Sequence, residues 1–173
     1  MAVETDPDSP TSTLVVMRHA KAESHAVTDH ARPLSPRGIA QARAAGEWLA
    51  EQGLSDVHAL VSSAVRTRET WRELARSIEA DVQYLDGLYD AGPGEILQTL
   101  RLLDDDVTTV MVVGHNPTMQ ALVVELSDRS PDGERDDTAV HGFSAASVAI
   151  LTHRDRWSDL DWGHCRTRAV HSP

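Results

Sequence analysis

Two arginines and two histidines stand out in this sequence because together they could handle a phosphoryl group. They are Arg18, His19, Arg66 and His115. Arginine offers planar, permanently charged, bidentate donors for phosphate oxygens. A neutral histidine can attack phosphorus and form a covalent phosphoenzyme, which divides one difficult hydrolysis into two easier steps. The four side chains are far apart in the sequence, so a shared site depends on the fold.

The stretches before these residues predict that the four side chains converge. Short apolar runs rich in β-branched residues, typical of buried strands, occur at 13–17, 57–61 and 108–113. Each run ends at or shortly before one of the arginines or histidines. A parallel sheet gathers the carboxyl ends of its strands at one edge, and ligands bind in the crevice there. We therefore expect one phosphate-binding site at that edge.

Helix signals alternate with the strand signals. Ser35 can cap a helix that Pro36 opens and Gly53 ends. Asn116 can cap another helix, which Pro117 opens. The alternation predicts an α/β fold, with a mainly parallel sheet and helices on both faces. Further helices are expected at 64–78 and 95–103, further strands at 82–85 and 147–151, and an edge pairing at 156–162.

Length and composition narrow the class of protein. The chain has 173 residues, 40% of them apolar and 25% charged, which suits a single globular domain. Residues 1–12 are polar and lack the apolar core of a signal peptide, so we expect a disordered lead-in before a domain at 13–173. The single cysteine, Cys165, excludes an internal disulfide and falls in an expected C-terminal tail.

The net charge bears on possible partners and on location. A formal net charge of −11 argues against nucleic acid and anionic membrane as partners, although it does not forbid a local basic pocket. No segment is apolar over the length that spans a bilayer. The lone cysteine is compatible with a reducing compartment. We expect a cytoplasmic protein, and a monomer.

Four motifs in this sequence resemble those of the histidine phosphatase superfamily. Met17-Arg18-His19-Ala20 is similar to its Arg-His-Gly signature, with alanine in place of glycine. Arg32-Pro33-Leu34-Ser35, with Gly38, resembles its Arg-Pro-Leu-Ser/Thr-x-x-Gly stretch. The segment 62–70 resembles its second-strand motif, and 113–117 its second histidine motif. The motifs occur in the family's order, and the wording is most similar to the small SixA-type branch.

The resemblance assigns a role to each of the four residues. It implies that His19 is the nucleophile and becomes phosphohistidine. It implies that Arg18 and Arg66 clamp the phosphoryl oxygens, and that His115 donates a hydrogen bond to the phosphoryl group in the transition state. It implies a three-layer α/β/α sandwich, a phosphorylated substrate, and no metal or organic cofactor.

The predicted site also needs a general acid for some substrates. Many relatives use a glutamate to protonate the leaving group, and Asp90 lies in the corresponding region of this chain, with Glu95 as a second candidate. An alkyl phosphate needs such an acid, whereas phosphohistidine has a better leaving group. The absence of the acid would therefore favour labile substrates.

Several functions fit these residues. The resemblance favours a protein phosphohistidine phosphatase. The same mechanism could instead hydrolyse a small phosphomonoester. Further alternatives are a non-catalytic phosphate-binding regulatory module and a metal-dependent hydrolase that uses the many histidines.

Charged residues near the motifs have simpler interpretations. Lys21, Glu23, His25 and His30 follow the first histidine motif, where each could rim the pocket or be an ordinary solvated loop residue. Arg68 is expected to be a surface helix residue paired with acids. The roles of His25 and His30 stay open at this point.

Overall fold

A six-stranded sheet forms the centre of the computed structural model, which describes residues 11–128 and 142–173. Its strand order is β3-β2-β4-β1-β5-β6. The first four strands of that order are mutually parallel, β5 runs antiparallel to β1, and β6 runs antiparallel to β5. The strands are β1 (Ser12–Arg18), β2 (Val57–Ser62), β3 (Ala80–Leu85), β4 (Thr109–Gly114), β5 (Val148–His153) and β6 (Arg166–His171).

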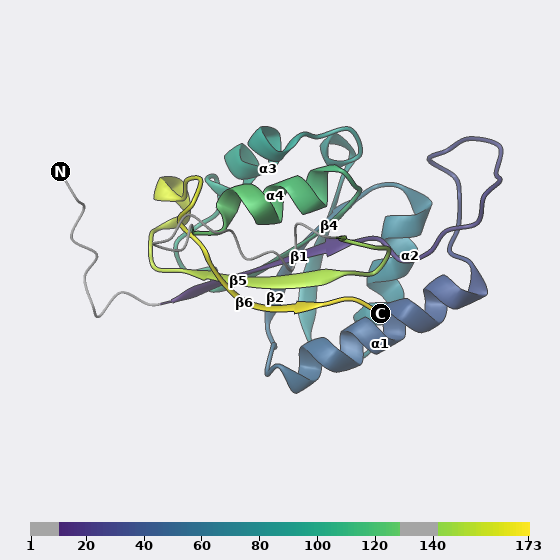
Figure 1. Ribbon diagram of the computed structural model, residues 1–173, viewed down its shortest axis with the longest axis horizontal. Coiled ribbons are helices and arrows are strands. Elements are labelled where there is room, and N and C mark those ends of the chain that lie inside the picture. The colour runs from purple at the N-terminus through teal and green to yellow at the C-terminus, as the bar shows by residue number, and fades with distance from the viewer. Residues whose placement is uncertain (1–10, 129–141) are drawn as a thin grey trace.

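Helices cover both faces of this sheet (Figure 1). One face carries α1 and α2, which pack against each other, and the other carries α3 and α4. Successive residues of β1 alternate between the two apolar cores, as a strand's period of two requires. The predicted three-layer α/β/α sandwich with a mainly parallel sheet is confirmed. The helices are α1 (Pro36–Glu51), α2 (Val65–Leu74), α3 (Pro93–Leu100) and α4 (Thr118–Leu126).

The register of the central strands brings the predicted site together. Arg18, at the end of β1, pairs with Gly114 at the end of β4. On the other side of β4, Val113 pairs with Val61 of β2. The chain therefore leaves β1, β4 and β2 at one edge of the sheet. The first histidine motif, the second histidine motif and the start of α2 emerge there side by side.

Local sequence signals explain how the first helix begins and packs. The side chain of Ser35 accepts a hydrogen bond from the backbone N–H of Gly38 at 3.1 Å, and Pro36 is the first helical residue, as predicted. A Cβ atom on Gly46 would overlap the carbonyl oxygen of Leu74. Glycine at this position therefore allows α1 to lie close against α2.

The C-terminal part of the chain differs from the sequence-based expectation. The expected edge pairing at 156–162 is wrong, because this segment holds a 3₁₀ turn, Trp157–Asp159. The indole N–H of Trp157 donates to the carbonyl of Val107 at 2.7 Å and the side chain is buried, which draws the segment into the core. The edge strand is β6 instead. Cys165, expected in a tail, is buried before it, and burial raises its pKa to about 12.

Other predicted boundaries differ from the observed ones by a few residues, and some predicted segments lie outside the described residues. The second helix ends at Leu74 rather than at Ile78. The fourth helix begins at Thr118, one residue after Pro117. Strand β1 includes Ser12, the last residue of the expected lead-in, whereas residues 1–10 and 129–141 lie outside the described part. Within the described ranges, every helix is too short or too polar to cross a membrane.

Candidate active site

His19 is held in one tautomer at the end of β1. Its Nδ1 lies 2.7 Å from the carbonyl oxygen of Ala20. A carbonyl can only accept, so Nδ1 carries the proton and Nε2 keeps a free electron pair. The backbone is fixed on both sides, since the N–H of His19 donates to Gly114 and its carbonyl accepts from Ala146. Burial, together with the charges of Arg66 and Arg18, lowers the pKa of His19 to about 4.

His115 faces His19 across the ends of β4 and β1. The two ring centroids are 5.3 Å apart. The Nε2 atom of His115 is 2.8 Å from the hydroxyl of the buried Ser62, at the end of β2. Burial and the neighbouring His19 lower the pKa of His115 to about 3, so both imidazoles are neutral at physiological pH. The Nδ1 atom of His115 is buried and has no hydrogen-bond partner among the described residues.

The two arginines are anchored at one edge of their guanidinium groups. Arg66, only 5% exposed, donates to the backbone carbonyl of Asp29 at 2.7 Å and to its carboxylate at 3.0 Å. Arg18 donates to the carbonyl of Phe143 at 3.1 Å. The Nε atoms of both arginines are buried without a partner among the described residues. Buried donors of this kind are normally satisfied, so an acceptor-rich ligand such as phosphate would complete the site.

Asp29 and Tyr89 complete the surroundings of Arg66, and sequence reasoning missed both. The hydroxyl of Tyr89 donates to the Asp29 carboxylate at 2.6 Å, and Arg32 donates to its other oxygen at 2.9 Å. The Tyr89 hydrogen bond and the arginines lower the pKa of Asp29 to about 2, so its carboxylate is ionised. The ring of Tyr89 also stands edge-on to His115, with centroids 5.4 Å apart. No periodic signal in a loop could have placed these two residues.

The motif from Arg32 to Gly38 anchors the loop that carries Asp29. The hydroxyl and the backbone N–H of Ser35 both donate to the carbonyl of Lys21, at 3.0 and 2.9 Å. A Cβ atom on Gly38 would overlap that same carbonyl oxygen. Glycine is therefore required where α1 meets the segment that follows His19.

The two candidate general acids differ in their contacts. Asp90 is exposed, and no described residue forms a hydrogen bond or ion pair with it. Its neighbour Tyr89 does reach the site. The carboxylate of Glu95 accepts the backbone N–H of Gly92 at 2.6 Å and so caps α3. The role of Asp90 as general acid therefore stays a prediction, whereas Glu95 stabilises the start of α3.

The loop residues after His19 form two groups: three are exposed to solvent, and one lies half-buried at the rim of the site. Lys21, Glu23 and His25 are exposed. His30 is half-buried, 3.1 Å from the hydroxyl of Ser63 and edge-on to Tyr89 at 5.0 Å. In the part of the chain that the structure describes, no group of three or more histidine, cysteine or acidic side chains could hold a metal ion.

The low pKa of His19 predicts an unusual pH dependence of its reactivity. Diethyl pyrocarbonate attacks neutral imidazole, so His19 should react at a nearly constant rate from about pH 8 to about pH 5 and lose half of it near pH 4. A free histidine derivative in the same solution should lose half its rate near pH 6.5, its ordinary pKa. Peptide mass spectrometry would follow both rates. A midpoint for His19 above about pH 6 would contradict its burial as a neutral base.

Comparison with known proteins places the fold and the motifs in one family. The family model described as the histidine phosphatase superfamily (branch 1) matches residues 14–101. An uncharacterized protein of Mycobacterium tuberculosis is 38% identical over 160 residues, covering 91% of this chain and 99% of its own. Phosphohistidine phosphatase SixA of Escherichia coli is 29% identical over 115 residues, covering 64% of this chain and 71% of its own.

Solved structures agree with this placement. A protein of Nakamurella multipartitia, provisionally named phosphohistidine phosphatase SixA, has 38% identity and a TM-score of 0.86, covering 97% of this chain and 99% of its own. A protein histidine phosphatase SixA in complex with tungstate has 26% identity and a TM-score of 0.76, covering 92% and 96%. The chain belongs to the histidine phosphatase superfamily and, within it, to the SixA-type branch of phosphatases.

Proposed function

We propose that this phosphatase removes the phosphoryl group from phosphohistidine in another protein, without a cofactor, through a covalent phosphohistidine on His19. The observation that carries the proposal is the state of His19. Its Nδ1–H donates to the carbonyl of Ala20 and its pKa is about 4, so a neutral Nε2 with a free electron pair is available. Nucleophilic attack on phosphorus requires this form of the imidazole.

The proposed reaction has two displacement steps at phosphorus. The Nε2 atom of His19 attacks, the P–N bond of the substrate breaks, and its electron pair returns to the substrate imidazole, which takes a proton from solvent. Water then attacks the phosphorus on His19. The P–Nε2 bond breaks with its electron pair returning to Nε2, and inorganic phosphate leaves carrying the protons of the water.

The other three residues stabilise the phosphoryl group in this scheme. The unpartnered Nε–H groups of Arg18 and Arg66 supply donors for its oxygens. His115 donates from Nδ1, which requires that the hydroxyl of Ser62 donates to its Nε2. Such donors act most strongly in a site from which water is excluded, because charge there is poorly screened.

The leaving group favours phosphohistidine over an alkyl phosphate. Asp29, the carboxylate in contact with Arg66, has a pKa of about 2 and is therefore no proton donor at neutral pH. Asp90 is exposed and lacks a described partner that would hold it toward the site. A general acid contributes about 10²- to 10⁴-fold to rate where the leaving group needs protonation. The SixA proteins among its relatives point to the same substrate class.

A paired turnover assay tests this proposal. Wild-type protein is given a phosphohistidine peptide, p-nitrophenyl phosphate and a sugar phosphate, with a chelator present. We expect kcat/KM for the phosphohistidine peptide to exceed that for the sugar phosphate by about 100-fold or more. Asp90→Asn should leave this preference in place.

Two outcomes would contradict the proposed function. Efficient turnover of the sugar phosphate that falls in Asp90→Asn would assign Asp90 as the general acid of a small-molecule phosphatase. Activity lost with the chelator and restored by a metal ion would contradict catalysis without a cofactor.

A further inference from the structure

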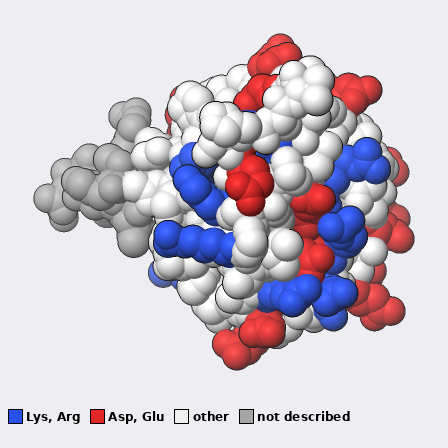
Figure 2. Space-filling view, turned by 90° about the vertical axis from the view of Figure 1, so that its right-hand side faces the viewer, with Lys and Arg blue, Asp and Glu red and all other residues white. Residues whose placement is uncertain are grey.

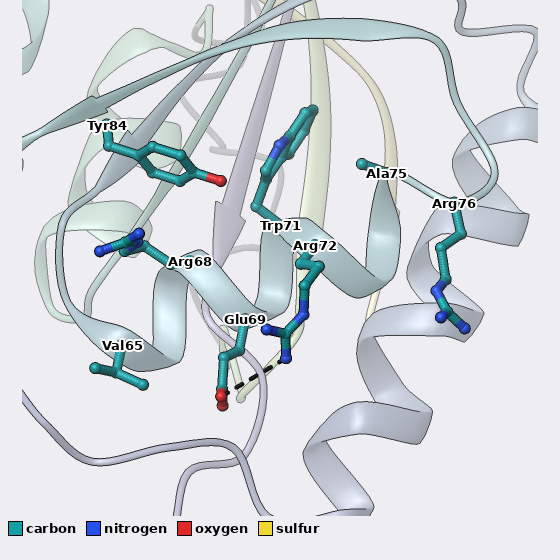
Figure 3. A pocket seen from close by; sticks show the side chains of 8 residues that line it. All are labelled: Val65, Arg68, Glu69, Trp71, Arg72, Ala75, Arg76 and Tyr84. Carbon is teal, nitrogen blue, oxygen red and sulfur yellow. Dashed lines mark ion pairs between the residues drawn. The ribbon is translucent and has the colours of Figure 1, made fainter.

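A cavity lies along the outer side of α2, and none of its lining residues belongs to the catalytic cluster of Arg18, His19, Arg66 and His115. Its volume is about 490 Å³, and it lies between α2 and the edge strand β3. Figure 3 shows its lining side chains, most of which project from successive turns of α2. We call this cavity the α2 groove. It is lined by Val65, Arg68, Glu69, Trp71, Arg72, Ala75, Arg76 and Tyr84.

The α2 groove combines arginines with an aromatic wall. Arg68, Arg72 and Arg76 follow one another at four-residue intervals and are all exposed, so they line one side of α2 and the turn after it. The guanidinium carbon of Arg68 lies 5.0 Å from the ring centre of Tyr84. The side chain of Tyr84 is exposed to solvent. Arg68 was expected to pair with acids, but its described contact is this ring. Its charge is therefore available to an incoming carboxylate.

The local charge of the α2 groove is positive in a strongly acidic protein. Its lining holds three arginines against one carboxylate, that of Glu69. That carboxylate already accepts the backbone N–H of Leu34 at 2.7 Å and lies 3.7 Å from Arg72. At 0.15 M salt, charges more than about 8 Å away are largely screened, so the chain's distant acids do not cancel this patch.

One buried carboxylate near the groove, that of Glu73, is shared among three arginines. Glu73 lies 2.8 Å from Arg43, 3.7 Å from Arg72 and 3.6 Å from Arg76. One carboxylate cannot neutralise three guanidinium groups. Arg72 and Arg76 therefore keep much of their charge on the solvent side. Figure 2 shows several basic side chains at this end of the molecule, with acidic side chains between them.

The α2 groove and the catalytic cluster share one helix. Arg66 and Arg68 both lie in the first turn of α2. The helix has 10 residues and is about 15 Å long. An extended peptide covers that length with about five residues. A chain whose phosphohistidine reaches His19 could therefore lay its next residues along the groove.

We propose that the α2 groove docks an acidic segment adjacent to the phosphohistidine of the protein substrate. The inference rests on the proposed function and adds to it the chemistry of the substrate's flank. Charge complementarity selects the occupant, because arginines bind carboxylates in bidentate fashion. A polynucleotide is disfavoured, since its long charged backbone would extend over a surface of net charge −11.

Three phosphohistidine peptides with a common core test the docking proposal. Each carries a flank of about eight residues on both sides, rich in glutamate, in lysine or in serine and glycine. At low salt we expect the acidic flank to lower KM about five- to tenfold relative to the neutral flank, with little change in kcat. The advantage should vanish in Arg68→Gln/Arg72→Gln and at about 0.5 M salt.

A matched control variant removes the same charge elsewhere. Arg154 and Arg156 are exposed and follow β5 at the opposite edge of the sheet, because His153 pairs with Ser12 at the start of β1. Arg154→Gln/Arg156→Gln should keep the preference for the acidic flank. Equal KM values for the three flanks in the wild-type protein, or equal losses in both double variants, would overturn the docking proposal.

A binding measurement separates failure of docking from failure of the proposed function. A fluorescent acidic peptide without phosphohistidine should bind the wild-type protein and bind Arg68→Gln/Arg72→Gln at least fivefold more weakly. If no phosphohistidine peptide is turned over but this difference in binding persists, the groove is a docking site for acidic peptides and the proposed substrate is wrong. Tighter binding of a single-stranded oligonucleotide than of the acidic peptide would overturn the choice of occupant. The salt dependence of the wild-type protein keeps the test valid if the variant fails to fold.

Discussion

His19→Ala is expected to lower kcat by about 10⁴-fold or more for every substrate, because it removes the proposed nucleophile. The loss should be in kcat rather than in KM, since the arginines that hold the phosphoryl group remain. Rapid quenching of the wild-type protein with ³²P-labelled substrate should trap an acid-labile, base-stable phosphoprotein. The same experiment with His19→Ala should trap none.

His25→Ala is the matched control for this prediction. His25 lies in the same loop, is exposed, and has no hydrogen bond or ion pair to other described residues. Its replacement should change kcat by less than about twofold. A phosphoprotein that persists in His19→Ala, or label that maps to another histidine, would sink the mechanism proposed here.

The strands that carry the candidate catalytic residues could be predicted from the sequence for a physical reason. The runs before Arg18 and His115 are apolar on both faces, because helices cover the sheet on both sides. Their order along the chain forces a parallel arrangement, and a parallel arrangement gathers the strand ends. Convergence of the four residues therefore followed from pattern alone, and the structure places them accordingly.

The partners of those residues could not be read in the same way. Asp29 and Tyr89 lie in segments without hydrophobic periodicity, 60 positions apart, and meet only through the folded loops. Nothing in their types distinguishes them from the nearby Asp90, which the sequence favoured. A hydrogen bond between two loops depends on loop conformation, which single-sequence patterns do not encode.

The edge strand β6 escaped prediction because it is not apolar. It contains arginines and a histidine, and one side faces solvent, as an edge strand permits. The tryptophan-containing segment before it was expected to pair at the sheet edge, yet Trp157 turns inward to the core. Tertiary burial of one large side chain decided the conformation there.

Arg66→Lys is expected to lower kcat/KM by about 10²- to 10³-fold for phosphohistidine and ester substrates alike. Lysine keeps the positive charge, so a large loss would show that geometry matters more than charge. The guanidinium of Arg66 uses one edge to bind Asp29, at 2.7 and 3.0 Å, and leaves its buried Nε–H unpartnered. A single ammonium group cannot hold Asp29 and a phosphoryl oxygen in fixed directions at the same time.

Arg37→Lys is the matched control for Arg66→Lys, because Arg37 is the second residue of α1 as Arg66 is of α2, yet it is exposed. It should keep kcat/KM within about twofold of wild type. The inhibition constant of vanadate should rise in Arg66→Lys by about the same factor as kcat/KM falls, because both report binding of the phosphoryl oxygens in the transition state. If Arg66→Lys folds normally and loses less than about fivefold in kcat/KM, the Arg66 guanidinium is not the source of phosphoryl stabilisation, and Arg18 with His115 must supply it.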